Sequence, residues 1–134
     1  MQTTTPSKHT GSCHCGAVRF TVEVDAGHGS RCNCRVCTKI AGTTAIVKPA
    51  AFTLDSDPAA LSEYGNEIGL RYFCSRCGVH CFSRGHLEQL GGDFVSVAIN
   101  CIDNIEMLSV KVLYWDGRHD NWAAGTRETP WPIA

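Results

Sequence analysis

The spacing of the cysteines constrains this chain more than any other feature of its sequence. Nine cysteines occur in 134 residues. Eight fall into three short motifs of the forms C-x-C, C-x-C-x-x-C and C-x-x-C-x-x-x-C, and the ninth stands alone: Cys13 and Cys15, Cys32, Cys34 and Cys37, Cys74, Cys77 and Cys81, and Cys101. Close pairs and triplets of this kind are typical of zinc ligands. We therefore expect metal sites rather than a framework of disulfides.

The rest of the sequence is consistent with reduced thiols. Residues 1–10 are polar and lack the apolar stretch of a signal peptide, and no segment approaches the roughly 18–20 apolar residues of a membrane span. We therefore expect a cytoplasmic protein without membrane contact. Thiols stay reduced in that compartment, which favours metal ligands over disulfides. We also expect residues 1–10 to form a flexible segment and residues 11–134 to form one zinc-bearing domain.

Composition excludes two other classes of protein. Hydrophobic residues make up 43% of the chain and charged residues 19%, which is typical of a globular domain and not of a disordered one. Twelve Lys and Arg against 13 Asp and Glu give a net charge of −1. Without a basic excess, we expect no nucleic-acid partner.

The cysteine motifs differ in how many ligands each supplies. Cys74 and Cys77 are followed by Gly78, as in a zinc knuckle, where a glycine lets backbone amides approach the sulfurs without a side-chain clash. Cys13 and Cys15 form a second pair and carry their own glycine, Gly16. A closed structural zinc needs four ligands, so two such pairs would complete one site.

The remaining cysteines leave two interpretations open. Cys81 or Cys101 could complete a second four-ligand site, which would make both zincs structural. Alternatively, Cys32, Cys34 and Cys37 hold a zinc whose fourth position is open, as a catalytic zinc requires. The second interpretation leaves Cys81 and Cys101 as buried, small hydrophobic residues.

Hydrophobic periodicity elsewhere is that of short strands. Apolar and polar residues alternate imperfectly over residues 17–24, and β-branched or aromatic residues fill several further segments: 43–47, 52–54, 70–73, 94–99 and 110–115. Helical turns are expected only at residues 38–41 and 102–107. This pattern predicts an all-β domain of five to eight short antiparallel strands with little helix.

Three segments resemble the glutathione-dependent formaldehyde-activating enzyme family, which also includes centromere protein V. The resemblance lies in the sequences GSCHCGAVRF, CNCRVCTKIAG and RYFCSRCG, which begin at Gly11, Cys32 and Arg71, and in a closing segment rich in Trp and Pro. It implies a zinc-stabilised, tent-like β fold. It also implies a structural zinc on Cys13, Cys15, Cys74 and Cys77 and a catalytic zinc on Cys32, Cys34 and Cys37.

The resemblance further implies a reaction, the addition of glutathione to formaldehyde or a related small aldehyde to give S-hydroxymethylglutathione, which is carbon-sulfur lyase chemistry. Glutathione has two carboxylates, and Arg31, Arg35 and Lys39 lie close in sequence to the three-cysteine motif that would bind its sulfur. We therefore expect these cations to contact the ligand. The alternative is that they are solvated surface groups, and that the protein is a thiol carrier or a zinc scaffold without turnover.

The histidines and tryptophans give weaker signals. His80 follows Cys77 by three residues and is a candidate donor to an alkoxide, alongside Arg35 and Lys39. The simpler interpretation of His80 is a polar residue beside the knuckle. Three tryptophans near the end of the chain are expected to pack in the core or over the site: Trp115, Trp122 and Trp131.

Overall fold

The computed structural model describes residues 6–66 and 69–134, which form ten strands, one α-helix and seven single-turn 3-10 helices. The strands are β1 (Ser7–Ser12), β2 (Arg19–Val24), β3 (His28–Cys32), β4 (Thr44–Val47), β5 (Phe52–Leu54), β6 (Leu61–Gly65), β7 (Leu70–Cys74), β8 (His80–Leu87), β9 (Gly92–Ala98) and β10 (Lys111–Trp115). The helix is α1 (Arg35–Ile40), and the 3-10 turns are Pro49–Ala51, Pro58–Ala60, Glu88–Leu90, Ile99–Cys101, Met107–Ser109, Gly117–His119 and Trp122–Ala124. The predicted all-β class is confirmed.

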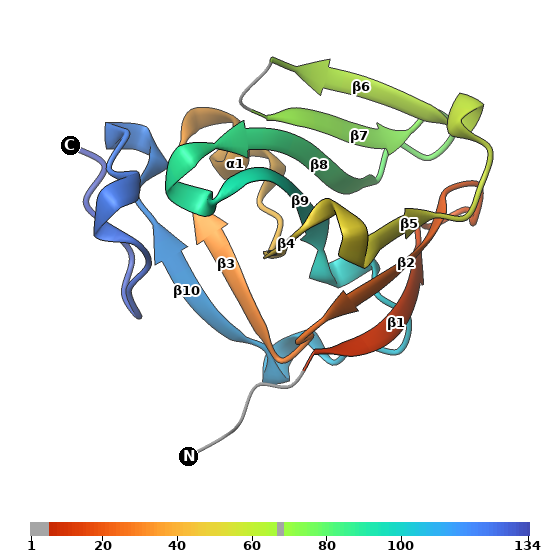
Figure 1. Ribbon diagram of the computed structural model, residues 1–134, viewed down its shortest axis with the longest axis horizontal. Helices are drawn as coiled ribbons and strands as arrows, with labels where there is room; N and C mark the ends of the chain where they lie inside the picture. Colours follow the sequence, from red (N-terminus) through yellow and green to blue (C-terminus); the bar gives the residue numbers. More distant parts are fainter. Residues whose placement is uncertain (1–5, 67–68) are drawn as a thin grey trace.

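The strands form two open sheets. A three-stranded sheet has the order β1-β2-β5, and a seven-stranded sheet has the order β10-β3-β4-β9-β8-β7-β6. In Figure 1, β3 and β10 diverge from β1 and β2 like two sides of a tent, and β6, β7 and β8 lie across the top. One pair departs from the expected antiparallel arrangement, because β3 and β10 are parallel. The chain crosses the domain between these two strands, so no hairpin forces them to run in opposite directions.

The hydrophobic core lies between the two sheets. Phe20 and Phe52 of the small sheet stack with ring centroids 5.5 Å apart, and Phe52 lies 4.5 Å from Phe82 of β8. Val95 and Val97 of β9 are fully buried beside them. Side chains alternate along β8 and β9, so one face of the large sheet contributes to the core and the opposite face does not.

Four strands are absent from the sequence-based expectation, and for this reason the structure has ten strands instead of five to eight: β1, β3, β6 and β8. β1 (SKHTGS) and β3 (HGSRC) contain few apolar residues, so hydrophobic alternation cannot reveal them. Their register is set by pairing with β2 and β10 instead. The expected flexible segment, residues 1–10, overlaps β1, whose residues Ser7–Ser12 all pair with β2, and residues 1–5 lie outside the described part of the chain.

Helix α1 begins earlier than the expected turn at residues 38–41. Its N-cap is Cys34, whose sulfur accepts from the amide of Cys37, and it ends at Ala41 in the left-handed conformation with φ of 58°. The expected helical turn at residues 102–107 is displaced, because one 3-10 turn, Ile99–Cys101, ends just before that segment and another, Met107–Ser109, begins at its last residue. Among the described residues, no helix has the length and apolar character needed to cross a membrane.

Candidate metal centres and cavity

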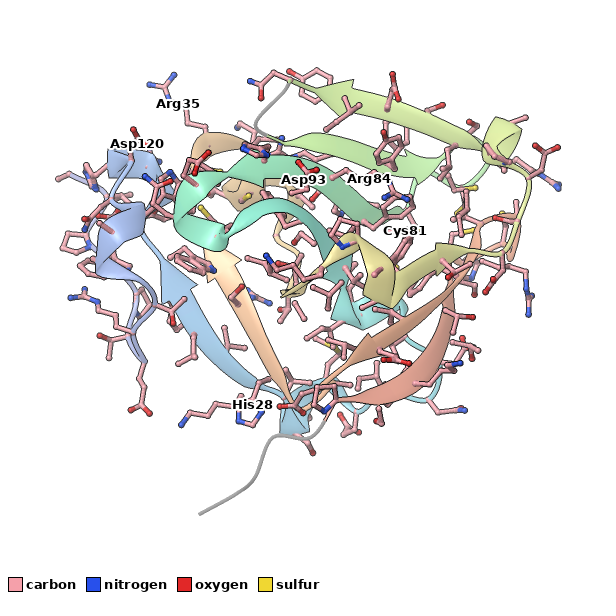
Figure 2. The ribbon with its side chains drawn as sticks, in the orientation of Figure 1. His28, Arg35, Cys81, Arg84, Asp93 and Asp120 are labelled. Atoms are coloured by element: carbon pink, nitrogen blue, oxygen red, sulfur yellow. The ribbon has the colours of Figure 1, made fainter. Side chains whose placement is uncertain are left out.

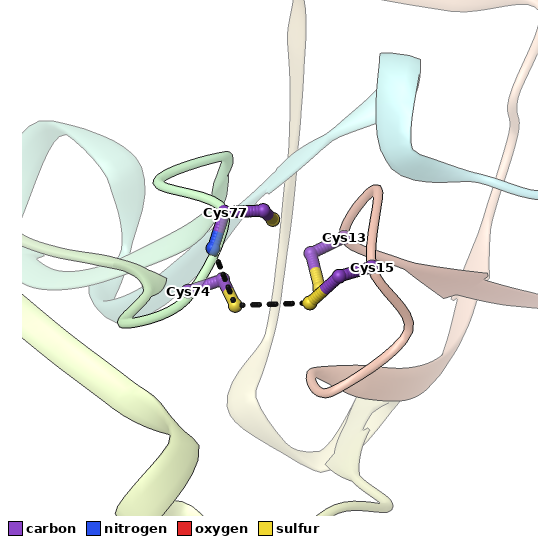
Figure 3. Close-up of side chains that lie close together, drawn as sticks. All are labelled: Cys13, Cys15, Cys74 and Cys77. Atoms are coloured by element: carbon purple, nitrogen blue, oxygen red, sulfur yellow. Dashed lines mark hydrogen bonds between the residues drawn. The ribbon is translucent and has the colours of Figure 1, made fainter.

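The first cluster joins two loops that are far apart in sequence. Cys13 and Cys15 follow β1, whereas Cys74 ends β7 and Cys77 lies in the turn after it (Figure 3). The sulfurs of Cys13 and Cys15 are 3.7 Å apart, and those of Cys15 and Cys74 are 3.6 Å apart. Four thiolates around a tetrahedral zinc, at a Zn–S distance of about 2.3 Å, would be separated by about 3.8 Å. The four sulfurs therefore fit a closed zinc site.

Backbone amides point at the sulfurs of this cluster. The Val18 amide donates to Cys13 Sγ at 3.3 Å, and the amides of Arg76 and Cys77 donate to Cys74 Sγ at 3.3 and 3.4 Å. Hydrogen bonding by the Cys77 amide lowers the pKa of Cys74. Hydrogen bonding by the Cys15 amide lowers the pKa of Cys77 to about 6. These donors favour the thiolate, which is the form that binds metal.

Gly16 and Gly78 follow the two cysteine pairs, as the knuckle interpretation predicts. Their φ angles are 84° and 77°, in the left-handed region that favours glycine. A Cβ built on either residue would have no neighbour within 4 Å. The expected reason, avoidance of a side-chain clash, is therefore wrong, and backbone conformation is what favours glycine at both positions.

The second cluster comes from one short segment. Cys32 ends β3, Cys34 caps α1, and Cys37 lies within α1. The three sulfurs lie within 4.8 Å of one another, and the amides of Cys34 and Cys37 donate to the sulfurs of Cys32 and Cys34, each at 3.4 Å. Hydrogen bonds from Cys32 and then Cys37 lower the pKa of Cys34. This donor set fits a zinc ion held by three thiolates.

No further His, Cys, Asp or Glu ligand atom of residues 6–66 and 69–134 joins either cluster. Cys81 and Cys101, which could have completed a second four-ligand site, are instead buried, at 0% and 6% exposure. Their expected burial is confirmed. His14 is exposed and belongs to neither cluster.

A cavity of about 330 Å³ adjoins the three-cysteine cluster. Its wall contains the three cysteines, a few polar groups that include Arg71 and His80, and a larger apolar set: Val36, Ile40, Ile46, Leu87, Leu90, Phe94, Trp115 and Trp122. Trp115 and Trp122 lie 5.8 Å apart between ring centroids, and the Trp115 indole N–H donates to Ser30 Oγ at 3.1 Å. This volume and mixed lining are typical of a small-molecule site.

Arg71 and His80 place charge and proton-transfer capacity in this cavity. Arg71 donates from Nη1 to the Gly69 carbonyl at 2.7 Å, and its Nη2 lies 4.0 Å from Cys37 Sγ. Burial lowers the pKa of His80, and the positive charge of Arg71 lowers it further. His80 Nε2 is buried and has no hydrogen-bond partner in the described part of the chain. His80 is therefore neutral at neutral pH.

The three cations expected to contact a ligand lie outside this cavity lining. Arg31 donates from Nε to Thr43 Oγ1 at 3.0 Å and lines a separate, smaller cavity together with Trp131. Arg35 and Lys39 are exposed on α1, and Figure 2 shows Arg35 extending outward from the molecule. The cavity cation, Arg71, was not among the predicted contacts. The only signal for it in the sequence is a charged residue within a predicted strand, three positions before the knuckle.

A buried carboxylate supports the three-cysteine segment from the C-terminal side. Asp116 accepts from Asn33 Nδ2 at 2.8 Å and from His119 Nδ1 at 2.7 Å. The Asn33 bond and then the His119 bond lower the pKa of Asp116 below that of an ordinary carboxyl. Asn33 stands between Cys32 and Cys34, and its Oδ1 accepts from the Arg118 amide at 2.9 Å. The segment after β10 is thus fixed against the cluster.

Comparisons with known proteins point to one family. The family model described as glutathione-dependent formaldehyde-activating enzyme matches residues 8–117. Two similar proteins carry that enzyme name provisionally. The protein from Halomonas elongata is 38% identical over 82 residues, which cover 50% of this chain and 50% of the relative. The protein from Talaromyces marneffei is 32% identical over 98 residues, which cover 66% of this chain and 52% of the relative. The chain spans about half the length of these curated relatives.

A solved structure supports the fold independently. The crystal structure of a Rhodobacter sphaeroides protein is similar with a TM-score of 0.65 at 20% identity, covering 92% of this chain and 99% of that one. This likeness concerns the fold alone. The match of the family model to residues 8–117, more than half of the chain, decides the family. The chain belongs to the glutathione-dependent formaldehyde-activating enzyme family.

Proposed function

We propose that this chain holds two zinc ions and adds a thiol, glutathione in the first instance, to formaldehyde or a related small aldehyde. Four cysteines would hold a structural zinc and three would hold a catalytic zinc: Cys13, Cys15, Cys74 and Cys77, and Cys32, Cys34 and Cys37. The product would be an S-hydroxymethyl thiol, which makes the reaction that of a carbon-sulfur lyase in the synthetic direction. Seven thiolate ligands suit the reducing cytoplasm, where we place the activity.

The observation that carries this proposal is the contrast in surroundings of the two clusters. The four-cysteine cluster supplies four protein sulfurs, as many as a tetrahedral zinc can bind. The three-cysteine cluster supplies three sulfurs and adjoins a cavity of about 330 Å³. A tetrahedral zinc with three protein ligands keeps one position for a substrate or water, as catalytic zinc sites do.

When bound there, zinc would favour the deprotonated form of a substrate thiol and keep its sulfur nucleophilic. The chain's contribution to proton transfer would come from His80, which lines the same cavity and is neutral because burial lowers its pKa. A neutral imidazole can accept the proton of the thiol and return it to the aldehyde oxygen. The carbon-sulfur bond forms, the carbonyl π bond breaks, and the thiol proton ends on the hydroxyl.

Formaldehyde consumption in the presence of glutathione tests this function. We expect a rate above that of the uncatalysed addition for the zinc-loaded protein, and a return to the uncatalysed rate for Cys34→Ser. Metal content must be measured in the wild-type protein and in Cys34→Ser, so that the rates are compared between folded proteins that keep the zinc of the four-cysteine cluster. A rate equal to the uncatalysed one in the folded, zinc-loaded wild-type protein would contradict turnover.

Binding measurements separate an enzyme from a thiol carrier. Calorimetry in buffers of different ionisation enthalpy would count the proton released when glutathione binds, since its thiol is mostly protonated near neutral pH. S-methylglutathione keeps both carboxylates but cannot become a thiolate, so we expect it to bind more weakly. Tight binding of glutathione without turnover would favour the carrier function.

A further inference from the structure

A row of three polar residues crosses the cavity face of the large sheet. Arg71 of β7 pairs directly with Ser83 of β8, and Ser83 pairs with Ser96 of β9. All three line the cavity. Directly opposed residues on neighbouring strands project to the same face. Strand spacing of about 4.8 Å makes this row roughly 10 Å long.

The neighbours of this row point the other way. Phe82 and Val97 lie beside Ser83 and Ser96 in sequence and are buried in the core between the sheets, at 1% and 0% exposure. The guanidinium carbon of Arg84 lies 5.4 Å from the ring centroid of Phe52 and 5.5 Å from that of Phe82, on the core side of the sheet. The polar residues are thus a feature of the cavity wall and not of the outer surface.

The row has hydrogen-bonding capacity that the described residues do not use. The hydroxyls of Ser83 and Ser96 have no partner in residues 6–66 and 69–134. Arg71 donates from Nη1 to the Gly69 carbonyl and, over 4.0 Å, from Nη2 to Cys37 Sγ, and no described carboxylate lies within ion-pair distance of it. A guanidinium has five N–H donors, so Arg71 keeps donors that a ligand in the cavity can use.

Arg71 is also the only permanent cation among the described residues that line the cavity. The described lining contains one carboxylate, Asp120, whose Oδ1 accepts from the Trp122 indole N–H at 2.7 Å. The described lining therefore offers one place where a negatively charged group of a ligand can form an ion pair with a permanent cation.

We infer that Arg71, Ser83 and Ser96 form a subsite for a single carboxylate of the thiol substrate. This inference rests on the proposed thiol-binding function of the three-cysteine cluster and specifies which thiols it selects. A thiol with one carboxylate near its sulfur satisfies the subsite. The second carboxylate of glutathione finds no cation in the described lining and adds no ion pair.

Calorimetry on the zinc-loaded protein tests the subsite with three thiols: 3-mercaptopropionate, 2-mercaptoethanol and glutathione. We expect 3-mercaptopropionate to bind at least as tightly as glutathione, and the neutral 2-mercaptoethanol to bind more weakly. Arg71→Gln should weaken the two carboxylate thiols by roughly ten- to a hundredfold, the range for losing a charge-assisted hydrogen bond, and leave 2-mercaptoethanol unchanged. Arg71→Lys keeps the positive charge but cannot form two parallel hydrogen bonds to a carboxylate, so its loss of affinity for the carboxylate thiols should be intermediate.

Arg84→Gln is the matched control, because Arg84 lies on the next strand but faces the core side. It should bind all three thiols like the wild-type protein. Zinc content, measured by native mass spectrometry, checks that Arg71→Gln keeps both ions. Equal affinities for the carboxylate thiols in Arg71→Gln and wild-type protein would overturn the subsite alone, as would a loss confined to Arg35→Gln. Failure of every thiol to bind the wild-type protein would overturn the proposed function as well.

Discussion

The two cysteine clusters consist of the same kind of side chain but differ in how far apart in the sequence their residues lie. The four-cysteine cluster ties a loop after β1 of the small sheet to the turn after β7 of the large sheet. The three-cysteine cluster lies within residues 32–37 and ties together nothing distant. Metal binding that bridges distant segments is coupled to folding, so we expect loss of metal from the four-cysteine cluster to cost more stability than loss from the three-cysteine cluster.

Burial separates the two clusters only in part, because Cys15 of the four-cysteine cluster is exposed and Cys77 is partly exposed. Cys13 and Cys74 are 3% and 0% exposed and pack within the hydrophobic core. Cys32, Cys34 and Cys37 are all partly exposed and adjoin the cavity. Ligand count and chain topology are therefore the two differences on which the proposed division into a structural and a reactive site rests.

The largest expected effect comes from breaking the cross-sheet cluster. Cys74→Ser should unfold the domain, because domains are stable by only about 5–15 kcal/mol and a structural zinc contributes a large part of that in small metal-bound folds. Cys37→Ser should leave a folded protein, with a loss of about 1–2 kcal/mol. Thermal unfolding followed by circular dichroism measures both. A melting temperature that falls as far for Cys37→Ser as for Cys74→Ser would contradict the division of roles.

An intermediate effect is expected where the C-terminal segment touches the local cluster. A Cβ on Gly117 would lie against Cys32 Sγ and 2.8 Å from Trp122 Cη2. Gly117→Ala should therefore cost about 1–3 kcal/mol through overpacking and weaken metal binding at the three-cysteine cluster only. Zinc content and thermal unfolding would show this.

Gly42→Ala is a control for that substitution, because Gly42 also borders the cavity but its Cβ would meet its nearest neighbour, Ile40, at an ordinary 3.6 Å. It should retain two zinc ions and near wild-type stability. If Gly117→Ala behaved like this control, the segment after β10 would not constrain the cluster.

The smallest effect concerns His80, which follows the first cluster in sequence and lines the cavity of the second. Burial lowers its pKa below the ordinary 6.5, so the unfolded chain binds more protons than the folded one between that lowered value and about 6.5. Stability should therefore rise with pH across this window and fall as the pH drops through it. His80→Gln lacks this term, so the wild-type protein should lose more stability than the variant between pH 7.5 and 5.5. Urea titrations at several pH values would measure the free energy of unfolding of both proteins. The same dependence on pH in the wild-type protein and in His80→Gln would contradict this prediction.

The sequence could predict the fold class and the separate cysteine motifs because both depend on local information, whereas the joining of two distant pairs into one cluster was implied by the family resemblance. Knuckle spacing and the glycines after Cys15 and Cys77 are readable without tertiary structure, as is the alternation in β2. β1 and β3 could not be found this way, because polar sequences become strands there through pairing with neighbours. Arg71 could not be assigned to the cavity for a similar reason. Its approach to Cys37 depends on how β7 and α1 pack, whereas Arg35 and Lys39 are nearer in sequence but project outward.

Native mass spectrometry of the zinc-reconstituted protein in the presence of glutathione tests the central claim most directly, because it counts metal and ligand on the same molecule. We predict two zinc ions and one thiol on each wild-type chain, and one zinc ion with no thiol on Cys34→Ser. A wild-type chain that retains a single zinc after reconstitution, or a Cys34→Ser chain that still carries the thiol, would contradict the assignment of a structural and a thiol-binding site to the two clusters.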